Sequence, residues 1–225
     1  MGMRLLRFAG LLLLTPTAFA HTVAEGDQAF VQASAGAQIA PFIYLGAKHM
    51  VTGYDHLLFL AGVIFFLHRL KDVALYVTLF ATGHSTTLLL GVLGDVPADP
   101  YLIDALIGLS VVYKALDNLG AFDAWIGARP DQKTAVLVFG FCHGFGLATK
   151  LQELGLSRDG LVANMLSFNL GVEIGQLLAL GFMLLVFDYW RSTKNFERRA
   201  YAANLVLLSA GFLLAGYQLA QYVLA

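Results

Sequence analysis

Residues 161–189 read LVANMLSFNLGVEIGQLLALGFMLLVFDY, an apolar stretch with few charges. A helix needs about 20 apolar residues to cross the hydrocarbon core of a bilayer, so this stretch is long enough to span one. Because lipid offers the backbone no hydrogen-bond partners, a spanning segment must satisfy its own N–H and C=O groups as an α-helix. The stretch therefore predicts a membrane-spanning helix.

The composition of the whole chain agrees with this prediction. Of the 225 residues, 58% are hydrophobic and 13% are charged, whereas an ordinary soluble domain has about a quarter charged residues. These values exclude a soluble enzyme and a disordered chain, and a single cysteine, Cys142, excludes a disulfide scaffold. The formal net charge of −1 argues against a nucleic-acid partner. The absence of a Walker motif excludes coupling to a nucleotide within this chain.

Further apolar segments are separated by short charged or Gly/Pro-containing loops. Gly53 is a candidate irregular point in the first of them, which is longer than a span needs. The predicted fold is an all-α integral membrane protein, a bundle of about six transmembrane helices within residues 39–225. The predicted spans lie near 41–67, 72–94, 100–120, 133–151, 161–189 and 200–223.

The N-terminal residues 1–20 resemble a cleaved signal peptide. Arg4 and Arg7 precede a short apolar run, and Ala18-Phe19-Ala20 has the small-x-small pattern that a signal peptidase accepts. The alternative is an uncleaved first helix, but the apolar run falls short of about 20 residues. Residues 21–38 are then expected to form a short periplasmic leader.

The distribution of Lys and Arg between loops predicts the orientation. The basic loop residues gather on one side of the predicted bundle, which is therefore cytoplasmic. Both mature termini then face the periplasm, and the protein is expected in the bacterial inner membrane. The residues on the basic side are Arg69, Lys71, Arg129, Lys133, Arg191, Lys194, Arg198 and Arg199.

Several polar side chains fall inside the predicted spans, where they are costly and usually functional. Histidines and a carboxylate on four spans lie at comparable depth, which predicts one central site. The candidate metal ligands are His49, His56, His84, His143 and Glu173. The candidate supporting residues are Asp55, Ser85, Asp104, Asn169 and Gln176.

Helical spacing refines this prediction for the first span. His49 and His56 are seven residues apart, which places them about 20° from each other on a continuous helix. Asp55 lies about 120° from His49, so it is expected to orient a histidine or to contact a neighbouring helix.

The donor types indicate a class of metal. Neutral imidazole and carboxylate suit Ni²⁺, Co²⁺, Zn²⁺ or Cu²⁺, whereas Cu⁺ favours sulfur ligands. Five methionines and one cysteine supply few of those. Two other readings remain open on these residues alone: a proton relay, and polar groups that only hydrogen-bond between helices.

Four sequence blocks resemble the HupE/UreJ family of hydrogenase and urease accessory membrane proteins. These blocks are GAKH at 46–49 with GYDHLLFL at 53–60, FATGHSTTL at 80–88, FGFCHGFG at 139–146, and FNLGVEIGQL at 168–177. The third span fits more loosely, because Asp104 and Asp117 stand where the family usually has Glu.

This resemblance implies a nickel or cobalt permease that supplies metalloenzyme maturation proteins. Because a histidine must be neutral to bind metal, acidification is expected to weaken uptake. One alternative is a membrane-embedded metal-dependent hydrolase, with Asp55 or Glu173 as general base and Ser85 assisting. Another is a metal-handling assembly partner of a second protein.

Overall fold

The apolar runs form helices in the computed structural model, which describes residues 25–67 and 69–225. The predicted signal peptide and the first residues of the leader lie outside the described residues. No strand occurs in the described ranges, so the predicted all-α fold is confirmed there. The helices are α2 (Glu25–Ala33), α3 (Ile39–Thr52), α4 (Tyr54–Ile64), α5 (Leu70–Gly94), α6 (Pro100–Asn118), α7 (Ala121–Ile126), α8 (Gln132–Glu153), α9 (Leu161–Arg191) and α10 (Phe196–Leu224).

Four helices of the described chain are long and apolar enough to cross a membrane, namely α5, α8, α9 and α10. The first predicted span is divided at Gly53 into α3 and α4. The third, α6, carries the buried charged residues Asp104, Lys114 and Asp117. Helix length and composition therefore support a multi-pass membrane protein, and the count of six spans stays a prediction.

Local sequence signals set the helix ends. Asp99 accepts a hydrogen bond from the backbone N–H of Leu102 at the start of α6, and Pro100 occupies the first helical turn. At the start of α8, Asp131 accepts a bond from the backbone N–H of Thr134 at 2.8 Å. The hydroxyl and the N–H of Thr134 lower the pKa of the Asp131 carboxyl, so this cap persists into mildly acidic solution.

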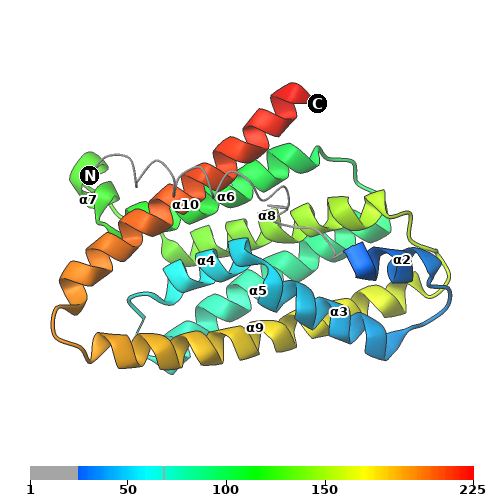
Figure 1. The fold of residues 1–225 in the computed structure, drawn as a ribbon, viewed down its shortest axis with the longest axis horizontal. Coiled ribbons are helices and arrows are strands. Elements are labelled where there is room, and N and C mark those ends of the chain that lie inside the picture. The colour runs from blue at the N-terminus through cyan, green and yellow to red at the C-terminus, as the bar shows by residue number, and fades with distance from the viewer. Residues whose placement is uncertain (1–24, 68) are drawn as a thin grey trace, which may run out of the picture.

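Three helix pairs form the body of the bundle: α3 with α9, α5 with α8, and α6 with α10 (Figure 1). Glycines at the contacts allow the backbones to touch, because a Cβ atom at any of them would lie within 2.8 Å of the partner helix backbone. The glycines are Gly46, Gly171 and Gly175 in the first pair, Gly83, Gly140 and Gly144 in the second, and Gly108 and Gly211 in the third.

Two further contacts hold the divided first span in place. Arg191, at the end of α9, donates to the carbonyl oxygens of Ile64 and Phe65 at 2.6 and 2.9 Å and so caps the C-terminus of α4. The predicted leader contains helix α2, which is joined to α3 by an ion pair between Asp27 and Lys48 at 2.6 Å.

The loops that contain the basic residues lie at one end of the bundle. In Figure 1 the α4–α5, α7–α8 and α9–α10 connections are at the left, and the α5–α6 and α8–α9 connections are at the right. The basic residues therefore gather at the end where the positive-inside rule expects the cytoplasm.

Candidate metal centre

Four histidines from four helices meet in the interior of the bundle. His49 comes from α3, His56 from α4, His84 from α5 and His143 from α8, and each is at most 8% exposed. His56 is central: its ring centroid lies 5.0 Å from that of His49, 5.7 Å from that of His84 and 5.0 Å from that of His143.

These side chains form two overlapping groups that could hold a metal ion. One group is His49, His56 and His84, and the other is Asp55, His56 and His143. Within each group the potential ligand atoms lie within 4.8 Å of one another. Imidazole and carboxylate donors in such groups suit borderline divalent transition metals.

The break at Gly53 brings two of these histidines together. Seven residues of continuous helix rise about 10.5 Å, yet the rings of His49 and His56 are 5.0 Å apart. A Cβ atom at Gly53 would lie 2.8 Å from His56 Nδ1 and 3.1 Å from Asp55 Oδ1. The absence of a side chain at this position therefore makes room for the two groups that begin α4.

Asp55 orients His56 from the first turn of α4. Its Oδ1 accepts the backbone N–H of His56 at 2.8 Å and lies 3.1 Å from Nδ1 of the same histidine. A carboxylate at one ring nitrogen fixes the orientation of an imidazole and raises its basicity as a ligand. Asp55 can thus act as a ligand in one group and as a positioning residue in the other.

Ser110 of α6 orients His143, and the sequence prediction did not include it in the site. Its hydroxyl donates to the carbonyl oxygen of Ile107 at 2.6 Å, so it acts as an acceptor toward His143 Nε2, which lies 3.1 Å away. This arrangement keeps the ring proton on Nε2 and places the metal-binding lone pair on Nδ1. A single serine within a helix carries no sequence signal for this role.

Replacing Ser110 with alanine should therefore weaken metal binding by about tenfold or more, as removal of a residue that orients a metal-binding histidine typically does. Equilibrium dialysis of Ni²⁺ against the purified protein measures this, and ¹⁵N NMR of the imidazoles reports the tautomer of His143. Ser167→Ala is the matched control, because the Ser167 hydroxyl bonds only the carbonyl of Ala163 among the interactions of the described chain. Equal affinities in the two variants would contradict the assigned role.

Aromatic side chains surround the histidines. Phe59 and Phe80 lie 5.3 and 5.1 Å from the ring of His143, and Phe168 lies 6.0 Å from that of His49. All three phenylalanines are at most 2% exposed. The aromatic shell keeps water out of the site, and this strengthens electrostatic interactions with a bound cation.

The remaining predicted ligand, Glu173, lies elsewhere. Neither group includes Glu173, which is exposed on α9 and lines a cavity of about 460 Å³ between α5 and α9. We call this cavity the α5–α9 groove. Its polar lining residues are Thr78, Thr82, Ser85, Thr86, Asn169, Glu173 and Gln176.

Three predicted supporting residues line the same groove. Ser85 donates to Asn169 Oδ1 at 2.8 Å, and Gln176 donates to the carbonyl oxygen of Val77 at 3.4 Å. Ser85 directly follows His84 in α5, so the wall of the groove is adjacent to the histidine cluster. The structure thus separates the predicted site into a buried histidine centre and a neighbouring polar groove.

Asp104 lies on α6 close to α8 and does not line the α5–α9 groove. It is 4% exposed on α6, and a Cβ atom at Gly146 of α8 would lie 3.4 Å from its Oδ1. Gly146 is three residues beyond His143 in α8, so Asp104 is placed about one helical turn from that histidine. It belongs to neither ligand group.

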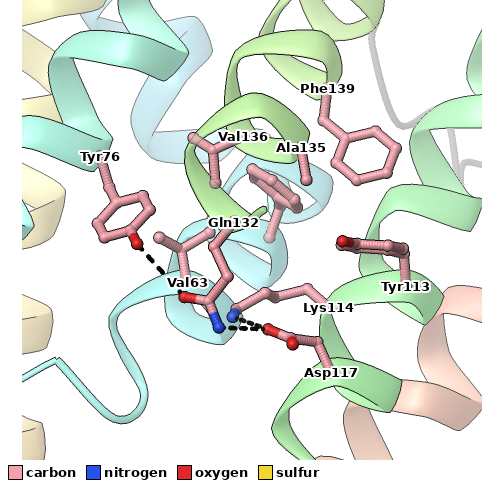
Figure 2. Close-up of a pocket in the computed structure, with 10 residues that line it drawn as sticks. Val63, Tyr76, Tyr113, Lys114, Asp117, Gln132, Ala135, Val136 and Phe139 are labelled. Atoms are coloured by element: carbon pink, nitrogen blue, oxygen red, sulfur yellow. Dashed lines mark hydrogen bonds and ion pairs between the residues drawn. The ribbon is translucent and has the colours of Figure 1, made fainter. Parts of the chain in front are cut away.

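The sequence prediction also did not include a second pocket, which is lined in part by polar residues of α6. Figure 2 shows its polar residues directed toward one another, namely Tyr76, Tyr113, Lys114, Asp117 and Gln132. We call it the α6 pocket, and Phe59 forms part of its wall.

Comparison with known proteins identifies the family. A family model described as HupE / UreJ protein matches residues 25–225, which is nearly the whole chain. Searches of curated proteins and of solved structures gave no match. The matched region includes all the histidines of the centre and both polar cavities. The chain belongs to the HupE/UreJ family.

Proposed function

We propose that this protein transports a divalent transition metal across the bacterial inner membrane, with Ni²⁺ as the first candidate and Co²⁺, Zn²⁺ or Cu²⁺ as alternatives. The observation that supports this most directly is the meeting of four buried histidines and Asp55 from four helices. Polar and ionisable groups at such depth mark ion pathways in membrane proteins.

The two ligand groups suit a transported ion. They share His56, so a cation can pass from one set of donors to the other without leaving protein ligands. Overlapping sites of this kind allow binding that is favourable enough for entry and weak enough for release. In this proposal His49, His56, His84 and His143 are the ligands, and Asp55 is both a ligand and the group that orients His56.

The α5–α9 groove offers the ion a route to the histidines. It is hydrophilic along one wall, and Glu173 supplies a negative charge that attracts cations. We therefore assign Glu173 to cation capture in the groove, and Ser85, Asn169 and Gln176 to its hydrogen-bonded wall. Asp104 would provide negative charge near α8, outside the groove.

The orientation and partners follow from the same proposal. The basic loops at one end of the bundle favour a cytoplasmic location for that end and a periplasmic location for both mature termini. Family membership supports an accessory role in metal supply, so we propose that maturation proteins of a metalloenzyme receive the ion.

Flux into proteoliposomes that contain only this protein tests the proposal. We expect Ni²⁺ uptake well above that of the double variant His56→Ala/His84→Ala, which lacks donors from both groups. Uptake should fall on acidification, because protonated imidazole cannot bind metal. Transport is contradicted if the fluxes of Ni²⁺, Co²⁺, Zn²⁺ and Cu²⁺ all equal those of the double variant.

The same preparation separates transport from the hydrolase alternative. Three histidines with an open fourth position resemble the ligand set of catalytic zinc, and His49, His56 and His84 form such a trio. A catalytic metal remains bound in stoichiometric amounts through purification, whereas a carrier must release its ion. Elemental analysis of the purified protein therefore distinguishes the two.

A further inference from the structure

An ion pair is buried inside the bundle and is not used by the proposed centre. The Nζ atom of Lys114 lies 2.5 Å from Asp117 Oδ2 on α6, and the two residues are 5% and 9% exposed. Burying such a pair costs solvation free energy that its mutual attraction often fails to recover. The pair is therefore weak evidence for stability, and its position and surroundings point to another role.

The pair is directly adjacent to the histidine centre. Ser110, which contacts His143, and Lys114 are four residues apart, so they share a face of α6 and are separated by about 6 Å along its axis. Phe59 packs on the ring of His143 at 5.3 Å and also lines the α6 pocket. Phe59 is thus next to both sites.

The α6 pocket also offers oxygen atoms to a cation. Asp117 Oδ2 accepts a bond from Gln132 Nε2 at 2.9 Å, and Gln132 Oε1 accepts one from the Tyr76 hydroxyl at 3.4 Å. The Tyr113 hydroxyl is turned into the pocket (Figure 2), and it is buried without a hydrogen-bond partner among the described residues. A carboxylate, an amide oxygen and two hydroxyls therefore belong to residues that line the same pocket as Lys114.

The pocket lies between the histidine centre and the basic end of the bundle. Gln132 is the first residue of α8, and Asp117 is next to the last residue of α6, so both belong to the end where the basic loops gather (Figure 1). The α6 pocket is therefore placed where an ion travelling from the histidines toward that end could bind.

We propose that the α6 pocket is a second, transient site for the same divalent cation, and that the Lys114 ammonium holds the position of the cation when the site is empty. This rests on the proposed transport function. A dication and an ammonium repel each other, so Lys114 must swing away on its flexible stem when the ion arrives. The competition makes the site weak, as release from a pathway requires.

Lys114→Gln tests this proposal, because it removes the competing charge and keeps a polar side chain. Equilibrium dialysis should show Ni²⁺ binding rising from about one to about two ions per protein, with the second ion bound about tenfold or more tightly than in the wild type. Adding Asp117→Asn should abolish the gain. Lys133→Gln, at an exposed position of the same end, is the matched control and should bind as the wild type does. No additional ion in a folded Lys114→Gln protein would overturn the proposal.

Two further measurements keep this result separate from the transport proposal and from misfolding. In the His56→Ala/His84→Ala background, Lys114→Gln should still bind one ion, whether or not the histidines bind metal. The neutral double variant Lys114→Gln/Asp117→Asn leaves no unpaired charge, so it should fold and keep the histidine-bound ion, while its flux falls about tenfold. If that variant had the flux of the wild type, the Lys114–Asp117 pair would have only a structural role, and the proposal of a second cation site would be overturned.

Discussion

Ni²⁺ binding should fall by at least about 100-fold when His56 is replaced with alanine, a loss beyond that expected for residues that only orient ligands. His56 belongs to both ligand groups, and its ring has the ring of each of the other three histidines as a neighbour. Its removal leaves each group with two members, too few to hold an ion in a dry interior. Equilibrium dialysis followed by elemental analysis measures the loss, and proteoliposome uptake should fall in parallel.

Single replacements of the other ligands provide the comparison. His49→Ala and His143→Ala each remove a donor from one group only, so each should weaken binding less than His56→Ala does. Gln218→Ala, at a buried polar position of α10 outside both groups, should bind normally. Equal losses in all three histidine variants would show a single four-histidine site and would contradict the two-group description.

The sequence predicted most of the helical framework because its signals are local. Apolar runs, their Gly/Pro and charged boundaries, and the loop charges each depend on neighbouring residues only. The break at Gly53 was also expected, because the first apolar run exceeds the length that a span needs. The number of membrane crossings is harder to predict from the sequence. Buried charges in α6 lower its apolar character without preventing its burial against other helices.

The depth of each histidine in its span predicts that the four meet, but depth does not predict which residues surround them. Depth along a helix can be counted from the sequence at about 1.5 Å per residue, whereas the rotation of each helix about its axis depends on packing. Glu173 has a depth that suits the centre, and the rotation of α9 turns it into the α5–α9 groove. Asn169 and Gln176 lie on the same face of α9 as Glu173 and also line the groove.

Residues that act through a contact between helices were the hardest to predict. Ser110 touches His143 only because α6 packs against α8, and no periodicity identifies that pairing. Lys114 and Asp117 are three residues apart and can pair on any helix. Only the packed bundle shows that the pair is buried and that Gln132 and Tyr76 extend it.

The close contact between α5 and α8 holds together two helices that carry ligands of the centre. At Gly144 a Cβ atom would lie 2.0 Å from the carbonyl oxygen of His84 and 2.5 Å from Thr87 Oγ1. Thr87 also donates to the carbonyl oxygen of Phe141 at 2.7 Å, so the backbones are held together at this point. Gly144→Ala must therefore separate the two helices that carry His84 and His143. We expect a destabilisation of about 3 kcal/mol, at the upper end of overpacking in a tight core.

Thermal unfolding in detergent and Ni²⁺ dialysis together measure the consequences of this separation. Both stability and affinity should fall, because the steric clash lies next to one ligand and involves the backbone of another. Gly216→Ala in α10 is the matched control: no atom lies within 4 Å of its Cβ position, and the higher helix propensity of alanine should stabilise that helix by up to about 1 kcal/mol. Wild-type affinity in a destabilised Gly144→Ala protein would mean that the histidines tolerate a wider helix spacing. The centre would then be held by its own side-chain contacts, and the close α5–α8 approach would serve the fold alone.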